Sequence, residues 1–85
     1  MEAVMEEKRL AIIGIFVHEL TCSEAVNALL HEYGAYIAGR QGVPCRERGI
    51  SVISVIVDAP NTVISALSGK LGRIPGVQAK AMYTK

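Results

Sequence analysis

Apolar residues recur along the chain with two different periods, and the changes of period divide it into six segments. Four segments are rich in Val, Ile and Ala or alternate apolar with polar residues, which is typical of β-strands. The other two repeat apolar residues every three or four positions, which is typical of α-helices. We expect strands at Lys8–Val17, 35–43, 50–57 and Val77–Tyr83, and helices at 22–33 and between Asn61 and Gly72.

Residues with hydrogen-bonding side chains stand where each helix is expected to begin. Thr21 or Ser23 can cap the first helix, and Glu24 follows Thr21 by three positions, which is the spacing of a capping box. Asn61 is a favourable cap for the second helix, and Gly72 lies where that helix is expected to end. The sequence therefore predicts side-chain capping at both helix starts.

The third segment is the least regular of the four predicted strands. It contains Gly39 and Gly42 and ends at Pro44. Glycine inside a strand often marks a bulge or a bend, and proline cannot donate a hydrogen bond to a neighbouring strand. We expect a strand with a bend or bulge, followed by a polar turn over 44–49.

The order strand, helix, strand, strand, helix, strand is that of the ferredoxin-like βαββαβ fold, an α+β fold. Its antiparallel sheet has four strands and carries two helices on one face. The segments 8–17 and 50–57, however, are apolar on both sides: Ile13 and Ile15 alternate with Ile12 and Phe16. Because monomers seldom expose a large apolar patch, we expect a homo-oligomer, a dimer or a tetramer, built through the helix-free sheet face. The alternative is a twisted sheet that tolerates exposed Val and Ile.

Composition and charge narrow the possible functions. The chain has 85 residues and a net charge of +1, which suits a single domain, expected over 8–85 after a flexible charged lead-in at 1–7. Near-zero charge argues against direct binding of nucleic acid. The acidic N-terminal residues do not resemble a signal peptide, and the apolar runs are too short to span a membrane.

Cys22 and Cys45 allow one disulfide at most, and we expect both to be reduced thiols in a cytoplasmic protein.

Three stretches of the chain carry a resemblance to a known family. Residues 29–34, 39–50 and 66–77 read LLHEYG, GRQGVPCRERGI and ALSGKLGRIPGV, and they resemble the iron-only hydrogenase system regulators. These small proteins are similar to ACT domains and to the C-terminal domain of the nickel-responsive repressor. The resemblance implies an ACT-like, ferredoxin-like fold, oligomers made through sheets, and a regulatory role in an iron-only hydrogenase system.

The chain departs from those relatives at their ligand sites. The repressor binds nickel through several histidines and a cysteine, whereas residues 40–51 here hold no histidine and only Cys45. The seven residues before the first strand are too short for the repressor's DNA-reading segment, so we expect no direct contact of these residues with DNA. ACT domains often bind an amino acid near a glycine after the first strand, and residues 18–21 contain none. His18, Cys22, His31 and Cys45 are the only soft ligands. A transition-metal site needs three or four ligands that converge, and His18 and Cys22 lie on either side of a strand end and a helix start, so we expect neither a metal nor a cofactor.

Three arginines near the predicted hairpin are the candidate binding residues. Arg40, Arg46 and Arg48 flank its glycines, and guanidinium groups suit phosphates or carboxylates. Together with His18 they are expected to contact a small anionic effector between protomers. The alternative is that these arginines are solvated charges beside Glu47. The sequence offers no Ser-His-Asp or paired-carboxylate arrangement, so no catalytic residue is assigned.

The leading hypothesis is a non-enzymatic regulatory or effector-sensing oligomeric module, with a protein partner as a further possibility. An alternative is a small acylphosphatase-like hydrolase on the same fold, because residues 39–46 partly match the phosphate loop of that family. In that family the loop follows the first strand and opens a helix, whereas here it precedes a strand. The other alternative is a purely structural interaction protein.

Overall fold

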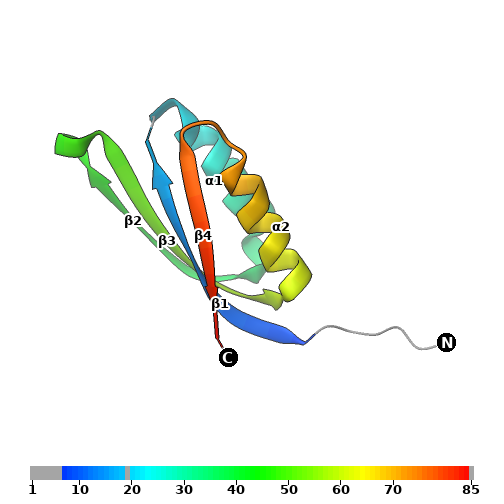
Figure 1. The fold of residues 1–85 in the computed structure, drawn as a ribbon. Helices are drawn as coiled ribbons and strands as arrows, with labels where there is room; N and C mark the ends of the chain where they lie inside the picture. Colours follow the sequence, from blue (N-terminus) through cyan, green and yellow to red (C-terminus); the bar gives the residue numbers. More distant parts are fainter. Residues whose placement is uncertain (1–6, 19, 85) are drawn as a thin grey trace.

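A computed structural model describes residues 7–18 and 20–84 of the chain. Four strands and two helices follow the expected order along the chain (Figure 1). Three short 3₁₀ turns lie between them, at Leu20–Cys22, Gly34–Tyr36 and Arg46–Arg48. The main elements are β1 Lys8–Val17, α1 Ser23–Glu32, β2 Ile37–Cys45, β3 Ile50–Pro60, α2 Asn61–Gly72 and β4 Val77–Tyr83. Of the lead-in expected at 1–7, only Glu7 lies within the described residues.

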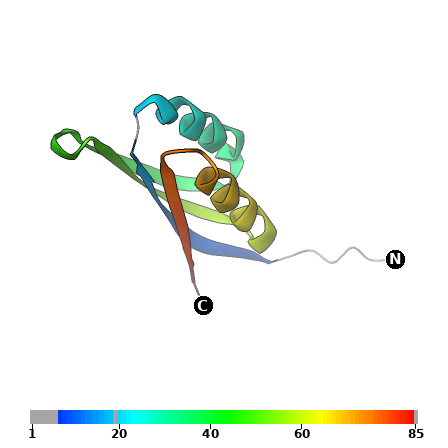
Figure 2. The ribbon, with the colours of Figure 1, turned by 45° about the horizontal axis from the view of Figure 1, so that its top comes forward.

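The strands form one antiparallel sheet in the order β2-β3-β1-β4. Both helices lie on the same side of this sheet, as the two ribbon views show (Figure 2). This is the topology of the ferredoxin-like fold, and the predicted fold class is confirmed. The central strands β3 and β1 come from distant parts of the sequence and hold the sheet together.

The core lies between the sheet and the two helices. Burial alternates along β1 and β3, because successive strand residues point to opposite faces. The side chains of Ile13 and Ile15 are fully buried and meet the apolar stripes of the helices. The largest fully buried side chains are Ile13, Ile15, Ile64, Leu67, Leu71, Val17, Val26, Val55 and Val57.

The predicted helix caps are wrong. The N-cap residue of α1 is Cys22 and that of α2 is Pro60, and neither position makes a side-chain capping hydrogen bond. A 3₁₀ turn precedes α1 and ends at Cys22, which moves the start of the helix past Thr21. Asn61 is the first helical residue of α2 rather than its cap. The end of α2 at Gly72 is confirmed.

The bounds of β1 and β4 agree with the sequence prediction, whereas the other two strands differ. The strand β3 continues to Pro60, because 58–60 pair with the first residues of β1. The strand β2 begins at Ile37, because a 3₁₀ turn occupies Gly34–Tyr36. The register shifts between Ile37 and Gly39, which confirms the predicted bulge.

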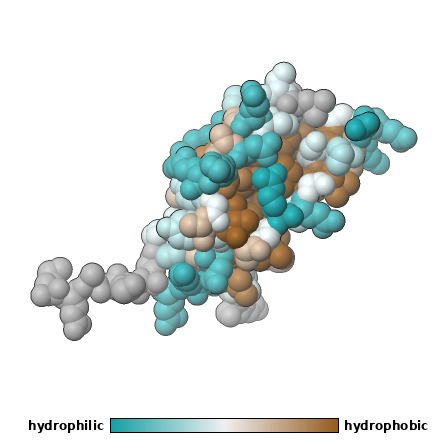
Figure 3. All heavy atoms as spheres, turned by 180° about the vertical axis from the view of Figure 1, so that it is seen from behind, coloured by the Kyte–Doolittle hydropathy of each residue, from teal (hydrophilic) through white to brown (hydrophobic). Residues whose placement is uncertain are grey.

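The helix-free face of the sheet is apolar, as the alternation predicted. Six large hydrophobic residues are 43–67% exposed in the single chain. They come from all four strands: Leu10, Ile12, Phe16, Val43, Ile56 and Met82. The view from behind the molecule shows hydrophobic side chains gathered at the surface and bordered by hydrophilic ones (Figure 3).

Candidate functional site

Arg46 and Arg48 lie at the tip of the β2–β3 hairpin. Both are exposed in the 3₁₀ turn Arg46–Arg48, which Gly49 closes with a φ of 67°. Together with Pro44, Cys45 and Glu47 they line a shallow hollow of about 390 Å³. Two guanidinium groups beside one carboxylate give the hollow an excess of positive charge, which suits a phosphate or carboxylate ligand.

Arg40 occupies a different place from the hairpin pair. It pairs in register with Val55, whose side chain is buried beneath the helices, so Arg40 also points to the helix side. Its Nη2 donates a hydrogen bond of 2.9 Å to Oδ1 of Asn27 on α1. The structure therefore separates Arg40 from the hollow that Arg46 and Arg48 line.

Two hollows lie on either side of the contact between Arg40 and Asn27. One, of about 190 Å³, includes Ser23 and Ser51, and the other, of about 520 Å³, includes His31. Asn27 and His31 are four positions apart on α1 and therefore share a helix face. Sequence reasoning missed this groove between α1 and β2. The four-residue spacing of Asn27 and His31 could have indicated that both lie on one helix face. The side of the sheet to which Arg40 points, however, depends on the bulge in β2.

His18 lies just beyond the end of β1. Its backbone N–H donates to the carbonyl of Gly76, and its ring Nε2 makes a hydrogen bond with Oε1 of Gln78 on β4. It does not line the hairpin hollow or the groove beside Arg40. The four candidate residues are thus distributed over three places: the hairpin tip, the α1–β2 groove and the β1–β4 end.

The two cysteines are free thiols and half-buried. The thiol of Cys22 lies 2.7 Å from the carbonyl oxygen of Pro75 and donates to it. Cys45 ends β2 and lies in register with Ile50. Among the described residues, no three His, Cys, Asp or Glu side chains come together in a way that could hold a metal ion.

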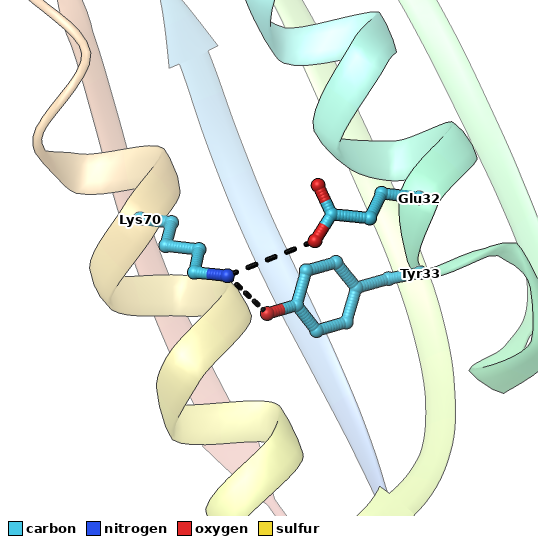
Figure 4. A network of polar contacts seen from close by, with 3 residues as sticks. All are labelled: Glu32, Tyr33 and Lys70. Atoms are coloured by element: carbon cyan, nitrogen blue, oxygen red, sulfur yellow. Dashed lines mark hydrogen bonds and ion pairs between the residues drawn. The ribbon is translucent and has the colours of Figure 1, made fainter.

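A polar network joins the outer sides of the two helices. Lys70 on α2 donates a hydrogen bond of 2.8 Å to the hydroxyl of Tyr33, which follows α1, and lies 3.7 Å from the carboxylate of Glu32 (Figure 4). The Lys70 ammonium also lies 5.1 Å from the centre of the Tyr33 ring. The hydrogen bond to Tyr33 raises the pKa of Lys70 above its ordinary value. This network connects the helices and has no adjoining ligand hollow among those described above.

The helix-free face also carries an apolar hollow. Leu10, Ile12, Ile56 and Met82 contribute to its walls, and its volume is about 280 Å³. Its lining also includes Thr84 and the strand residues Ala11 and Tyr83, whose side chains point toward the helices. A hollow of this kind fits an apolar side chain better than a charged metabolite.

The antiparallel sheet with both helices on one face defines a small ferredoxin-like α+β domain. Within this class the chain belongs to the TM1266-like family. The family model, described as "Iron-only hydrogenase system regulator, putative", matches residues 9–81. The resemblance seen in the three sequence stretches is therefore confirmed.

Two solved structures are similar to the chain. The TM1266 protein of Thermotoga maritima shares 40% sequence identity over 93% of this chain and 100% of its own length, with a TM-score of 0.89. The C-terminal domain of the MgtC protein from Mycobacterium tuberculosis shares 11% identity over 96% of this chain and 94% of its own, with a TM-score of 0.73. That second likeness shows the fold alone. No curated protein matches the chain significantly.

None of the helices in the described part of the chain is long and apolar enough to cross a membrane.

Proposed function

We propose that the chain is a non-enzymatic regulatory module of an iron-only hydrogenase system, and that it senses a small anionic effector as a cytoplasmic homo-oligomer. The family description supports the regulatory role. The observation that carries the oligomer is the apolar helix-free face, whose large side chains are 43–67% exposed in the single chain. Burying a half-exposed side chain of this size gains about 1 kcal/mol, so six on each protomer favour association.

The effector is proposed to bind at the hairpin tip, with Arg46 and Arg48 as its main contacts. Arg40 and His18, which lie elsewhere on the surface, would act at a second contact or through the partner protomer. Residues of β2 alternate between the two sides of the sheet: Arg40 faces α1, whereas Val43 lies on the helix-free face. A ligand that moves β2 would therefore also move part of the proposed interface. Effector binding would in this way change the geometry of the oligomer.

The hydrolase alternative finds less support than the regulatory one. Residues 39–45 lie in β2 and 46–48 in the 3₁₀ turn, so the stretch that partly matched a phosphate loop forms a strand and a hairpin tip. No helix follows to direct backbone N–H groups at a phosphate, because β3 begins at Ile50. Incubation with acetyl phosphate tests the point: turnover that depends on Arg46 or Arg48 would overturn the regulatory proposal.

Native mass spectrometry of protein purified without added ligand tests the oligomer. We expect a dimer or a tetramer, and a retained metabolite would appear as added mass. Phe16→Asp places a charge on the helix-free face and is expected to give a folded monomer. Ala66→Asp places the same charge at an exposed position of α2 and should leave the assembly intact. A monomeric unaltered protein, or equal effects of the two variants, would contradict the proposal.

A further inference from the structure

We infer that the second copy of the chain stacks on the helix-free face with a two-fold axis parallel to the strands, between β1 and β3. In this arrangement β1 of one protomer lies over β3 of its partner, and β4 lies over the partner's β2. The inference rests on the proposed function, since it takes the sheet face as the interface. It follows from the pattern of side chains across that face.

The strand registers place the residues of this face in rows that cross all four strands. The central row contains small or polar residues, in the order Gln41, Ser54, Gly14 and Lys80 from β2 to β4. The row on one side of it consists of Gly39, Ile56, Ile12 and Met82. The row on the other side consists of Val43, Val52, Phe16 and Gln78.

Aligned packing of two identical sheets allows two orientations of the axis. When the axis runs across the strands, each strand lies over the same strand of the other protomer, but in the opposite direction. Each central-row residue then faces the equivalent residue of the other protomer. Lys80 would then face the partner copy's equivalent ammonium group, and two like charges would be brought into an apolar interface. Such a contact costs free energy and works against this orientation.

When the axis runs along the strands, each row lies over the same row of the other protomer, whereas β1 lies over β3 and β4 lies over β2. Lys80 then faces the amide of Gln41 on the other protomer, which can accept a hydrogen bond from the ammonium group. Ile12 faces Ile56, and Phe16 faces Val52, so the large apolar side chains of the two central strands pack against each other. Gly14 faces Ser54, which keeps the centre of the interface free of steric conflict.

One pair of positions on the outer strands is complementary in shape, whereas in the other pair Val43 faces Gln78. Met82 on β4 is the most exposed of the six large hydrophobic residues, at 67%. In the proposed orientation it faces Gly39 on β2, where no heavy atom beyond Gly39 and its two chain neighbours lies within 4 Å of the position that a Cβ would take. A protruding side chain therefore meets a position without one. In the other orientation Met82 would face the polar Gln78.

A charge substitution at Gln41 distinguishes the two orientations. Within one protomer β3 and β1 separate Gln41 from Lys80, about 14 Å apart at ordinary strand spacing, so a strong effect of Lys80 must act between protomers. We expect Gln41→Glu to lower the dimer dissociation constant about two- to tenfold in low salt, measured by analytical ultracentrifugation, and the gain to disappear in 1 M salt. Gln41→Glu combined with Lys80→Gln is the matched control and should show no gain.

The opposite substitution completes the test. Gln41→Lys should weaken the dimer by a similar factor, and adding Lys80→Glu should restore it. A dimer that Gln41→Glu weakens or leaves unchanged would overturn the proposed axis while leaving the sheet-face dimer in place. An unaltered protein that stays monomeric would instead overturn the proposed function itself, so the two failures can be told apart.

A steric variant tests the contact between the outer strands. Gly39→Leu should weaken the dimer, because the new side chain meets Met82 of the other protomer, and adding Met82→Ala should recover most of the loss. Circular dichroism of both variants checks that the fold is retained. If Met82→Ala does not compensate, Met82 does not face Gly39 and the axis is wrong.

Discussion

The ammonium group of Lys70 lies 2.8 Å from the hydroxyl of Tyr33, and this hydrogen bond joins α2 to the end of α1. Both helices pack on the same face of the sheet (Figure 2). The contact raises the pKa of Lys70 above its ordinary value of 10.5, because the folded state favours the charged form. Its role in stability can therefore be tested by pH.

A raised pKa means that Lys70 binds its proton more tightly in the folded protein than in the unfolded chain. Its stabilising effect is complete below pH 10.5 and declines as the pH rises through the folded pKa. We expect Lys70→Met to lower the melting temperature by roughly 1–4 °C at pH 8 and by less at pH 11.5. Thermal denaturation followed by circular dichroism measures both. An undiminished difference at pH 11.5 would show that lost packing, rather than the charge, is responsible.

Adjacent isoleucines on β1 provide a matched comparison of the two sheet faces. Ile13 is fully buried, whereas Ile12 is 43% exposed on the helix-free face. Ile13→Ala should lower the free energy of unfolding by about 2–5 kcal/mol, because it leaves a cavity in the core. Ile12→Ala should cost less than about 1 kcal/mol at concentrations where the protein is monomeric. Urea denaturation of both variants checks this, and similar losses would contradict the assignment of the two faces.

Gly49 closes the β2–β3 hairpin in the left-handed region, with a φ of 67°. Gly49→Ala should destabilise the fold by about 1–2 kcal/mol, because a Cβ is strained in this conformation. Gly72→Ala is the control: Gly72 lies at the end of α2 with open space around it, and alanine favours helix. We expect the control to be neutral or slightly stabilising in urea denaturation. Equal losses would show that strain at Gly49 is not the cause.

The proposed effector site at the hairpin tip gives a prediction for anions. Inorganic phosphate should raise the melting temperature of the unaltered protein in low salt, because Arg46 and Arg48 bind it in the folded state. The double variant Arg46→Ala, Arg48→Ala should lose this shift. Arg73→Ala removes an exposed arginine next to α2 and should keep it. A shift that survives in the double variant would place the anion elsewhere.

The sequence was most informative where the periodicity was uninterrupted. The bounds of β1 and β4 follow from their alternation, and the apolar helix-free face follows from residues such as Ile12 and Phe16. Helix caps were not predictable from residue type, because a 3₁₀ turn moved the start of α1 and Pro60 took the cap position of α2. Tertiary pairing with β1 also extended β3 beyond the expected turn.

The candidate site was predictable only in part. Neighbours in sequence such as Arg46 and Arg48 do share a hollow, as local reasoning suggests. Arg40 was expected with them, but its direction depends on the register of β2, which no local pattern reveals. The groove that it forms with Asn27 brings together a strand and a helix, so its existence depends on how they pack.

The bulge in β2 has a consequence for every side chain that follows it. Ile37 and Arg40 are three positions apart, and in a regular strand they would point to opposite sides. Ala38 is the additional residue between the partners of Val57 and Ile56, so both Ile37 and Arg40 point toward the helices. If Ala38 instead paired with Ile56 in a regular strand, residues 39–45 would all point to the side opposite to the one they face now. Arg40 would then enter the surface that now holds Val43. Deleting Ala38, by contrast, would remove the bulge and keep Gly39 opposite Ile56, so a single extra residue holds the groove beside α1 and the helix-free face on their separate sides of β2.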